Sequence, residues 1–577
     1  MADFTTRNMT SRSPIYSTKG ICSSSQPLAS AVGISILQKG GTAADAAVAM
    51  AAALNVTEPC STGIGGDAFA LFYDASNNGK VTSFQGNGAT SADFTLELLA
   101  QRGFSVNAQP LDPHSGLCVT VPGAAMLWED LVKEHGKLSM IEVLEPAIKL
   151  AREGFPIGPI TSKQWSTEFL QGEEAFRVFK PNGFSPQTGQ IFKNPDLANT
   201  FEFVATHGVK DAFYNGRIAD AIVAAVAAYG GVLSKSDLQA HVTARESPIS
   251  SVFKGIRVYE TPPPTHGLAA LIALSLIDKI SSAEAETQQK CRQARGSIEE
   301  AHVGIECMRL AFADALRYIC DPKFHSVPVD VLLSDAYISE RAKDFDHTKS
   351  NDNINAGDLS AFENSDTVYF CVIDSYGNGC SMINSNYQGF GVGVVPKDCG
   401  FTLHNRGHNF SLIPGHRNVA APRKRPYHTI IPGLATRECD GSLYGVFGNM
   451  GAFMQPQGHT QLVRNVVQFK MDPQSAVDAP RWMVQGAGTR QDASDVQTST
   501  VKLEDGYGAE ADGGAPGFSA DTVAEYLKRK GHNILPIVKG YDRYVYGRAQ
   551  IIVRDNVSGV LCAGSEPRAD GCAMPQI

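Results

Sequence analysis

The chain has 577 residues, of which 43% are apolar and 19% charged, and its net charge is −9. This apolar content can bury a core and excludes a largely disordered chain, and the acidic balance argues against a nucleic-acid binder, which needs a basic stripe. The N-terminus lacks signal-peptide features, and the longest small-apolar run, Ala46–Leu54, is too short to span a membrane, so we expect a cytoplasmic protein without membrane contact.

Helix and strand signals alternate in the first third of the chain. An Ala-rich segment after Gly40-Gly41 predicts a helix over 42–55, which stops at Glu58-Pro59. A glycine-rich turn over 60–66 follows, and an apolar stretch over 68–73 then predicts a strand. The glycines therefore lie after a helix and before a strand.

Residues 120–330 are predicted to be mostly helical. Ser297-x-x-Glu300 is a capping box, in which each side chain satisfies a free N–H at the start of a helix. The amphipathic pattern of this helix continues to Ile319. A second, Ala-rich helix is predicted over 218–229, where Gly230-Gly231 end it.

From residue 366 onward the pattern indicates strands. Residues 367–374 form a nearly continuous apolar, β-branched and aromatic run, which is typical of a strand buried on both faces. Turn residues over 375–379 and a second strand over 380–385 complete a predicted hairpin. Further glycine-rich strands are predicted at 443–447 and 549–554.

The stretch 486–518 is rich in Gly, Asp, Ser and Thr and has few apolar residues. This composition favours a solvated loop insertion. Ser499 and Lys502 have the spacing of a serine–lysine catalytic pair, but they fall within this stretch. We therefore interpret both as surface residues.

Cysteine and histidine spacing predicts no metal site. The 12 cysteines are dispersed without a Cys-x-x-Cys pair, which favours buried free thiols over a disulfide framework, with pairing of Cys562 and Cys572 as the alternative. His404 and His408 have the spacing of two ligands on one helix face, but Gly407 and the following residues disfavour a helix there. We expect neither a metal nor a cofactor.

The usual phosphate-binding and nucleophile motifs are also missing. Gly63-x-Gly65-Gly66 lacks the strand-then-helix setting of a phosphate cradle, so it is either a structural turn or backbone that lines an active site. A Gly-x-Ser-x-Gly elbow is absent. Thr367 remains, as a polar residue that opens a very apolar strand, although a β-branched residue also suits a strand for structural reasons alone.

A series of motifs runs in order along almost the entire chain. They are Ser24-Ser-Gln-Pro-Leu28, Gly40-Gly-Thr-Ala-Ala-Asp45, Pro59 to Asp67, Thr120-Val-Pro-Gly123, Leu144-Glu-Pro-Ala147, Gly154-Phe-Pro156, Leu310-Ala-Phe-Ala-Asp314, Asp366 to Asp374, Asn386-Tyr-Gln-Gly389, Lys424-Arg-Pro426 and Gln455-Pro-Gln-Gly458. Together they resemble the γ-glutamyltransferase family of N-terminal nucleophile hydrolases. The resemblance is greatest to an intracellular branch that includes γ-glutamyltransferase-like proteins, oxamate amidohydrolases and some cephalosporin acylases.

The resemblance implies a fold and a processing event. The family's fold is a four-layer αββα sandwich of mixed α/β class, built as one shared core by two fragments. A precursor would cleave the bond between Asp366 and Thr367, giving a large subunit 1–366 and a small subunit 367–577. These two fragments would form a heterodimer, with higher oligomers open. The new α-amine, with a reference pKa of about 8, would then serve as base for the Thr367 hydroxyl.

Matching positions imply the remaining catalytic groups. Ser385 corresponds to a threonine that polarises the nucleophile, and it keeps the hydroxyl. Gly451 and Ala452 correspond to two glycines whose amides bind the oxyanion. The second glycine is alanine here, and its amide can still donate if its φ is negative. Asn386 and Tyr387 lie in a matching motif and are expected to contact substrate.

The expected substrate pocket departs from the γ-glutamyl pattern. The arginine that clamps the substrate α-carboxylate is missing from the corresponding stretch, 85–90. An aspartate that holds the α-amine matches Asn409, which loses the charge, and a glutamine matches Arg406, which could supply the missing cation or form a structural ion pair. A serine pair matches His428 and Thr429.

These matches favour a self-processing amidohydrolase that acts on a small amide, such as glutathione or one of its conjugates, through a Thr367 acyl-enzyme. One alternative is a hydrolase of another acidic amide, of oxamate or N-acyl type, which the missing arginine favours. Another is an inactive relative that serves as a scaffold, although the retention of Thr367, Ser385 and Gly451 argues against it.

Self-cleavage predicts two bands on a denaturing gel. The fragments 1–366 and 367–577 of this 61.7 kDa chain should migrate at about 39 and about 22 kDa. Mass spectrometry of the smaller fragment should find Thr367 at its N-terminus. A full-length band that persists after long incubation contradicts the prediction.

Overall fold

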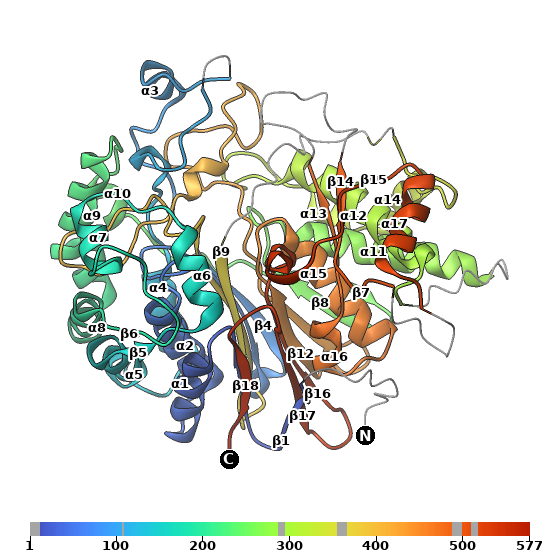
Figure 1. The fold of residues 1–577 in the computed structure, drawn as a ribbon, viewed down its shortest axis with the longest axis horizontal. Coiled ribbons are helices and arrows are strands. Elements are labelled where there is room, and N and C mark those ends of the chain that lie inside the picture. The colour runs from blue at the N-terminus through green and yellow to red at the C-terminus, as the bar shows by residue number, and fades with distance from the viewer. Residues whose placement is uncertain are drawn as a thin grey trace.

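The computed structural model describes residues 12–106, 109–286, 295–352, 354, 366–486, 499–508 and 517–577. In these residues two antiparallel sheets face each other, and helices cover the outer face of each sheet (Figure 1). One cluster of buried apolar side chains lies between the sheets. A larger cluster lies between each sheet and the helices that cover it. The layers form the αββα sandwich that the family resemblance implies.

Each sheet takes strands from distant parts of the chain. The six-stranded sheet has the order β18 (Cys572–Pro575), β2 (Ile21–Ser24), β9 (Asp366–Ile373), β10 (Gly379–Tyr387), β3 (Asp67–Asp74), β4 (Lys80–Gly86). The seven-stranded sheet has the order β1 (Ile15–Ser17), β17 (Leu561–Ser565), β16 (Ala549–Arg554), β12 (Leu443–Asn449), β11 (Gly433–Arg437), β8 (Ile256–Glu260), β7 (Ile249–Phe253). Two small sheets consist of β13 (Trp482–Gln485), β14 (Thr500–Leu503) and β15 (Asn533–Ile534), and of β5 (Phe155–Pro156) and β6 (Ile191–Phe192).

The helices divide between the two outer layers. Beside the six-stranded sheet lie α1 (Pro27–Gln38), α2 (Ala43–Thr57), α4 (Ala124–His135), α5 (Met140–Glu153), α6 (Pro159–Thr167), α7 (Glu173–Phe179), α8 (Pro195–His207), α9 (Arg217–Ala228) and α10 (Lys235–Gln239), with α3 (Leu96–Gln101) above them. Beside the seven-stranded sheet lie α11 (Gly267–Glu286), α12 (Ile298–Tyr318), α13 (Val329–Leu332), α14 (Asp335–Arg341), α15 (Met454–Val463), α16 (Pro473–Asp478) and α17 (Ala520–Arg529). No helix in the described ranges is both long enough and apolar enough to cross a membrane.

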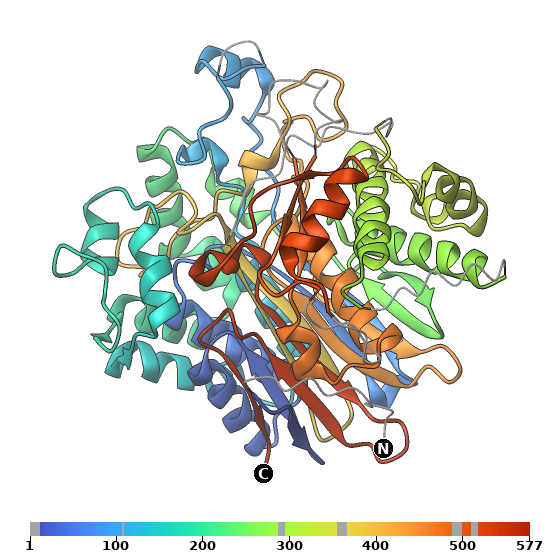
Figure 2. The ribbon, with the colours of Figure 1, turned by 45° about the vertical axis from the view of Figure 1, so that its right-hand side comes forward.

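Residues before and after position 366 are interleaved in both sheets. β9 hydrogen-bonds to β2 on one side and to β10 on the other, and β10 pairs in turn with β3. At the sheet edges, β1 pairs with β17 and β2 with β18, so strands from the two ends of the chain lie side by side (Figure 2). The two predicted fragments would therefore share one core.

Local sequence explains how β9 is held in the sandwich. Thr42 and Asp45 form a capping box at the start of α2, whose side chains are all buried. Ala43 donates its backbone N–H to Asp374 Oδ2 at 2.7 Å, which joins this helix end to the turn after β9. The many alanines of α2 let the helix pack closely on its neighbours, because they have no bulky side chain.

Most predicted elements are present, and the prediction for 486–518 is wrong in its described part. The range 120–330 is mostly helical, as predicted, and it also contains the β7–β8 hairpin, whose turn residues Lys254 and Gly255 both have positive φ, 47° and 80°. The range 486–518 was expected to be solvated loop, but its described part contains β14 between β13 and β15, with Val501 and Leu503 buried. Both segments are too short for their alternating pattern to stand out from the surrounding composition.

Candidate active site

Thr367 lies near the start of β9 and is fully buried beside Ser385 of β10. The pairing of β9 with β10 shifts register between Asn384 and Tyr387, so Ser385 falls within an irregular part of the ladder. Such bulges are common beside active sites because they redirect a side chain. Here the two hydroxyl oxygens, Thr367 Oγ1 and Ser385 Oγ, lie 2.9 Å apart.

The hydrogen bonds around Ser385 bear on the direction of this contact. Ser385 Oγ accepts the backbone N–H of Tyr387 at 2.8 Å and an N–H of Arg406 Nη2 at 3.4 Å. A hydroxyl accepts two hydrogen bonds and donates one. Because Ser385 Oγ accepts these two hydrogen bonds, it can act as the donor toward Thr367 Oγ1, and in that direction the contact leaves the proton of Thr367 available for transfer.

Arg406 is the cation that contacts this hydroxyl pair from the side of Ser385. It lies in a short 3₁₀ helix, Arg406–Asn409, and is fully buried. Its Nη1 donates to Thr429 Oγ1 at 2.7 Å, and its guanidinium lies 4.3 Å from the centre of the Tyr387 ring. Burial lowers the pKa of Arg406 to about 10, so the side chain stays charged at neutral pH.

Asp67 and two histidines surround Arg406 on the side of β3. Asp67 lies opposite Ser385 in the ladder, and its Oδ2 accepts from His428 Nε2 at 2.9 Å and lies 4.0 Å from Arg406 Nε. Burial raises the pKa of Asp67 to about 7, against the opposing effect of Arg406. Burial also lowers the pKa of His428 and that of His404, the latter to about 3, so both imidazoles are neutral.

Asn409 and Asn386 both have described protein partners. Asn409 Oδ1 accepts from the Tyr387 hydroxyl at 2.5 Å, and its Nδ2 donates to the Tyr427 carbonyl at 3.1 Å. Asn386 Nδ2 donates to the Pro59 carbonyl and to Thr402 Oγ1, both at 3.2 Å. The side chain of Asn386 thus supports the glycine-rich turn.

That glycine-rich turn packs against the backbone of the hydroxyl pair. A Cβ on Gly66 would lie 2.3 Å from the Ser385 carbonyl oxygen, closer than any side chain can approach. A Cβ on Gly65 would lie 2.3 Å from the Thr402 carbonyl oxygen. The glycines are therefore required for close backbone approach beside the site. The segment is thus both a structural turn and backbone next to the candidate site, the two interpretations that the sequence left open.

Gly451 and Ala452 follow the end of β12 in conformations with positive φ. Their φ values are 120° and 48°, so a negative φ at Ala452, the condition set for its amide, is not met. An L-residue in the left-handed region costs about 1–2 kcal/mol, which explains why glycine suits the position better. Within the described ranges, neither backbone N–H has a hydrogen-bond acceptor.

Arg548 is a site residue that the sequence analysis missed. Its Nη2 donates to the Thr367 carbonyl and to Ser61 Oγ, both at 3.3 Å, and its Nη1 lies 3.2 Å from Glu58 Oε2. The Arg548 carbonyl also accepts the N–H of Met450, immediately before Gly451. A lone arginine before a buried strand was the available signal, but the pattern could not identify its partners.

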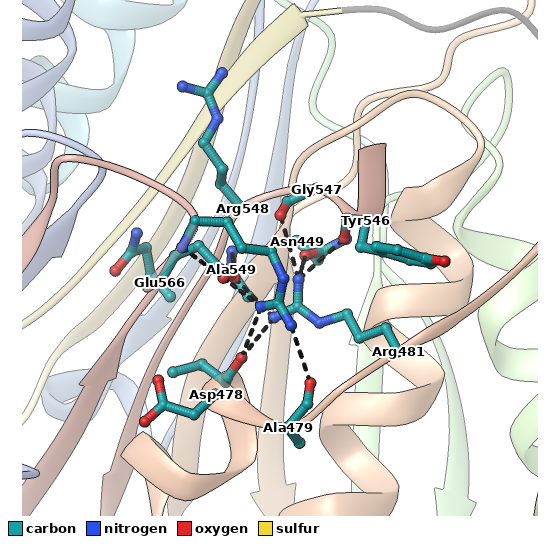
Figure 3. Close-up of polar contacts among 12 residues, drawn as sticks. Asn449, Asp478, Ala479, Arg481, Tyr546, Gly547, Arg548, Ala549 and Glu566 are labelled. Atoms are coloured by element: carbon teal, nitrogen blue, oxygen red, sulfur yellow. Dashed lines mark hydrogen bonds and ion pairs between the residues drawn. The ribbon is translucent and has the colours of Figure 1, made fainter. Parts of the chain in front are cut away.

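A buried charge cluster anchors the segments on either side of Arg548. Arg481 donates to Asn449 Oδ1 at 3.0 Å and to Glu566 Oε2 at 2.7 Å, and Glu566 accepts the N–H of Ala549 at 2.8 Å. Figure 3 shows the Arg548 side chain extending away from this cluster toward β9, drawn in pale yellow. The cluster holds the backbone of Arg548 while its guanidinium reaches Thr367.

Other candidates from the sequence lie outside this arrangement. Ser499 is buried and accepts from Arg309 Nε at 2.9 Å, so the prediction that it lies on the surface is wrong. In the part of the chain that the structure describes, no group of three or more His, Cys, Asp or Glu side chains could hold a metal, and Cys562 and Cys572 are both free thiols. The side chain of Asp366 lies outside the described residues.

Comparison with known proteins gives matches over almost the whole chain. A family model described as gamma-glutamyltranspeptidase matches residues 29–576. The chain is 32% identical to the glutathione hydrolase-like YwrD proenzyme of Bacillus subtilis over 97% of this chain and 99% of that protein. It is 30% identical to the oxamate amidohydrolase proenzyme of Klebsiella pneumoniae, over 96% and 98% of the two chains. A cephalosporin acylase structure from Bacillus halodurans has a TM-score of 0.84 and 37% identity, covering 100% of this chain and 99% of that one.

The contact between Ser385 and Thr367 predicts a hydroxyl-dependent activity. Ser385→Ala should lower the rate of amide hydrolysis about tenfold or more, because one hydrogen bond to the reacting oxygen is lost. Ser385→Thr should keep most of the rate. Ser381→Ala is the matched control, because Ser381 is buried on the same strand and contacts Tyr369 instead. Equal losses in Ser381→Ala and Ser385→Ala, at equal folded fraction, would contradict the assignment.

Proposed function

Because this chain belongs to the gamma-glutamyltranspeptidase family, we propose that it is a self-processing amidohydrolase whose nucleophile is Thr367. The observation that carries the proposal is the 2.9 Å contact between Thr367 Oγ1 and Ser385 Oγ in a fully buried setting. The names of relatives, which include a glutathione hydrolase-like proenzyme and an oxamate amidohydrolase proenzyme, support both the amide chemistry and the processing.

Self-processing begins with attack of Thr367 Oγ1 on the carbonyl carbon of Asp366. The C–N bond between the two residues breaks, the acyl group moves to the oxygen as an ester, and the nitrogen takes up a proton as the new α-amine. Water then hydrolyses the ester and releases the Asp366 carboxylate. The fragments 1–366 and 367–577 remain together because both sheets contain strands from each.

Turnover uses the liberated amine as the base. The neutral α-amine takes the proton of Thr367 Oγ1, and the oxygen attacks the substrate carbonyl while Ser385 donates to it. The N–H of Gly451 receives the developing oxyanion, which suits its lack of an acceptor among the described residues. The protonated amine then gives its proton to the leaving amine, and water hydrolyses the acyl-enzyme.

Arg406 gives the acyl site a preference for an acidic group. Its Nε has no hydrogen-bond partner among the described residues, although the side chain is fully buried. A substrate carboxylate would satisfy that N–H and receive a charge-assisted hydrogen bond. Thr429, which already accepts from Arg406, holds the guanidinium in place.

The partners of Asn409 separate two classes of acidic amide. A γ-glutamyl group also carries an α-ammonium, which needs acceptors, and Asn409 Oδ1, which accepts the Tyr387 hydroxyl at 2.5 Å, has one lone pair left for it. Asn409 carries no negative charge to offset an ammonium, and the nearby Arg406 repels one. The geometry therefore favours an acidic amide without an α-ammonium, of oxamate or N-acyl type, over a γ-glutamyl amide.

Replacing the nucleophile tests the proposal directly. Thr367→Ala should leave the chain uncleaved and abolish hydrolysis, because the variant has no hydroxyl to attack either carbonyl. Thr367→Ser is the matched control and should still cleave. Gel mobility and amide hydrolysis are measured for both variants. Cleavage or turnover that persists in Thr367→Ala would mean that another residue is the nucleophile.

Substrate preference is tested with paired anilides. Glutaryl p-nitroanilide differs from γ-glutamyl p-nitroanilide by the α-amine alone, and we expect it to have a kcat/KM at least about tenfold higher. Asn409→Asp should move this ratio toward the γ-glutamyl substrate, because it restores a negative charge. Arg406→Met should lower the ratio of glutaryl to uncharged butyryl anilide hydrolysis, whereas Arg406→Lys should largely preserve it. If neither Asn409→Asp nor Arg406→Met changes its substrate ratio, the proposed pocket is contradicted.

A further inference from the structure

Arg548 joins the two predicted fragments at the nucleophile. The side chain is 2% exposed, and its partners Glu58, Gln164 and Ser61 precede the cleavage position. It also donates to the carbonyl oxygen of Thr367, which follows that position. The guanidinium thus contacts the backbone of the residue that would carry the new α-amine.

We propose that Arg548 is a positioning residue for the nucleophile, which fixes the backbone of Thr367 and keeps the liberated α-amine in its uncharged, basic form. The inference rests on the proposed function, because the amine exists only after cleavage at Thr367. It adds a second role for buried cationic charge at the site, separate from the substrate contact of Arg406.

The physical reason is repulsion between like charges. The carbonyl oxygen and the amine nitrogen belong to the same residue, so a guanidinium 3.3 Å from the oxygen also lies near the nitrogen. A nearby cation disfavours the protonated amine, and burial acts in the same direction. An amine that titrates near neutrality is a better base at physiological pH than one that stays protonated.

The other described charges near the start of β9 determine the net effect. Glu58 partly neutralises Arg548, and burial raises the pKa of Glu58 against the opposing effect of Arg548. On the other side, Arg406 reaches Ser385 and is opposed by Asp67. The imidazoles of His404 and His428 are neutral, because burial lowers their pKa values. Removing Arg548 and removing Glu58 should therefore shift the pKa of the α-amine in opposite directions.

Competitive acetylation of the mature protein measures the amine directly. Acetic anhydride reacts with the neutral α-amine, and mass spectrometry of the peptide that begins at Thr367 follows the reaction as a function of pH. Arg548→Met should raise the pKa of the amine by about one pH unit, because the repelling cation is lost. Glu58→Gln should lower it, because the cation is no longer neutralised, and Arg548→Lys should leave it near the wild-type value. The acid limb of kcat/KM for glutaryl p-nitroanilide should shift in parallel.

Arg309→Met is the matched control. Arg309 forms a buried ion pair with Glu306 on α12, and neither residue has a described contact with Thr367. This variant should lose stability without any shift in the amine titration. If Arg548→Met does not mature, the downward shift in Glu58→Gln carries the test.

Three results contradict one or other proposal. Shifts of the same sign in Arg548→Met and Glu58→Gln, or none in Glu58→Gln, would overturn the role of Arg548. Failure of Arg548→Lys to mature or to keep the wild-type titration would also overturn it, because that variant preserves the charge. Wild-type protein without a free amine at Thr367 would instead refute self-processing, so the two failures are distinguishable.

Discussion

The arrangement at this site depends on the limited hydrogen-bonding capacity of one hydroxyl. Ser385 Oγ accepts from the Tyr387 backbone and from Arg406, so it can act as donor toward Thr367. The shifted register between β9 and β10 makes this geometry possible, because Ser385 lies where regular pairing is interrupted. The proposed nucleophile, Thr367, thus has a hydroxyl partner and not a histidine, which fits the lack of any familiar triad in the sequence.

Buried charge surrounds this hydroxyl pair and is paired on both sides. Arg406 lies with Asp67, and Arg548 lies with Glu58, each pair being almost completely removed from solvent. Burying an ion pair is costly and seldom adds stability. The two pairs are therefore better understood as devices that hold Ser385 and Thr367 in fixed electrostatic surroundings than as stabilisers of the fold.

The interleaved topology connects the proposed processing with the integrity of the fold. Because both sheets combine strands from before and after residue 366, cutting the chain there leaves the hydrogen bonds of β9 with β2 and β10 available. The strain at Ala452 and the close approach at Gly66 show that backbone near the site is also constrained. Family membership identifies amide chemistry, but the hydrogen bonds that Asn409 already makes bear on which acyl group is accepted.

The sequence by itself determined the sandwich class, most strands and helices, and the residues Thr367, Ser385, Arg406 and Thr429 that the structure brings together. Periodicity predicted the strands and helices because it is local along the chain, whereas the sandwich class and the site residues came from the family resemblance that the ordered motifs carry. The partners of Asn409, the positive φ of Ala452 and the contact of Arg548 with Thr367 were decided only by the tertiary structure. Residues 367 and 548 are far apart along the chain. A pattern of residue types does not give the distance between two side chains that come into contact only when the chain folds.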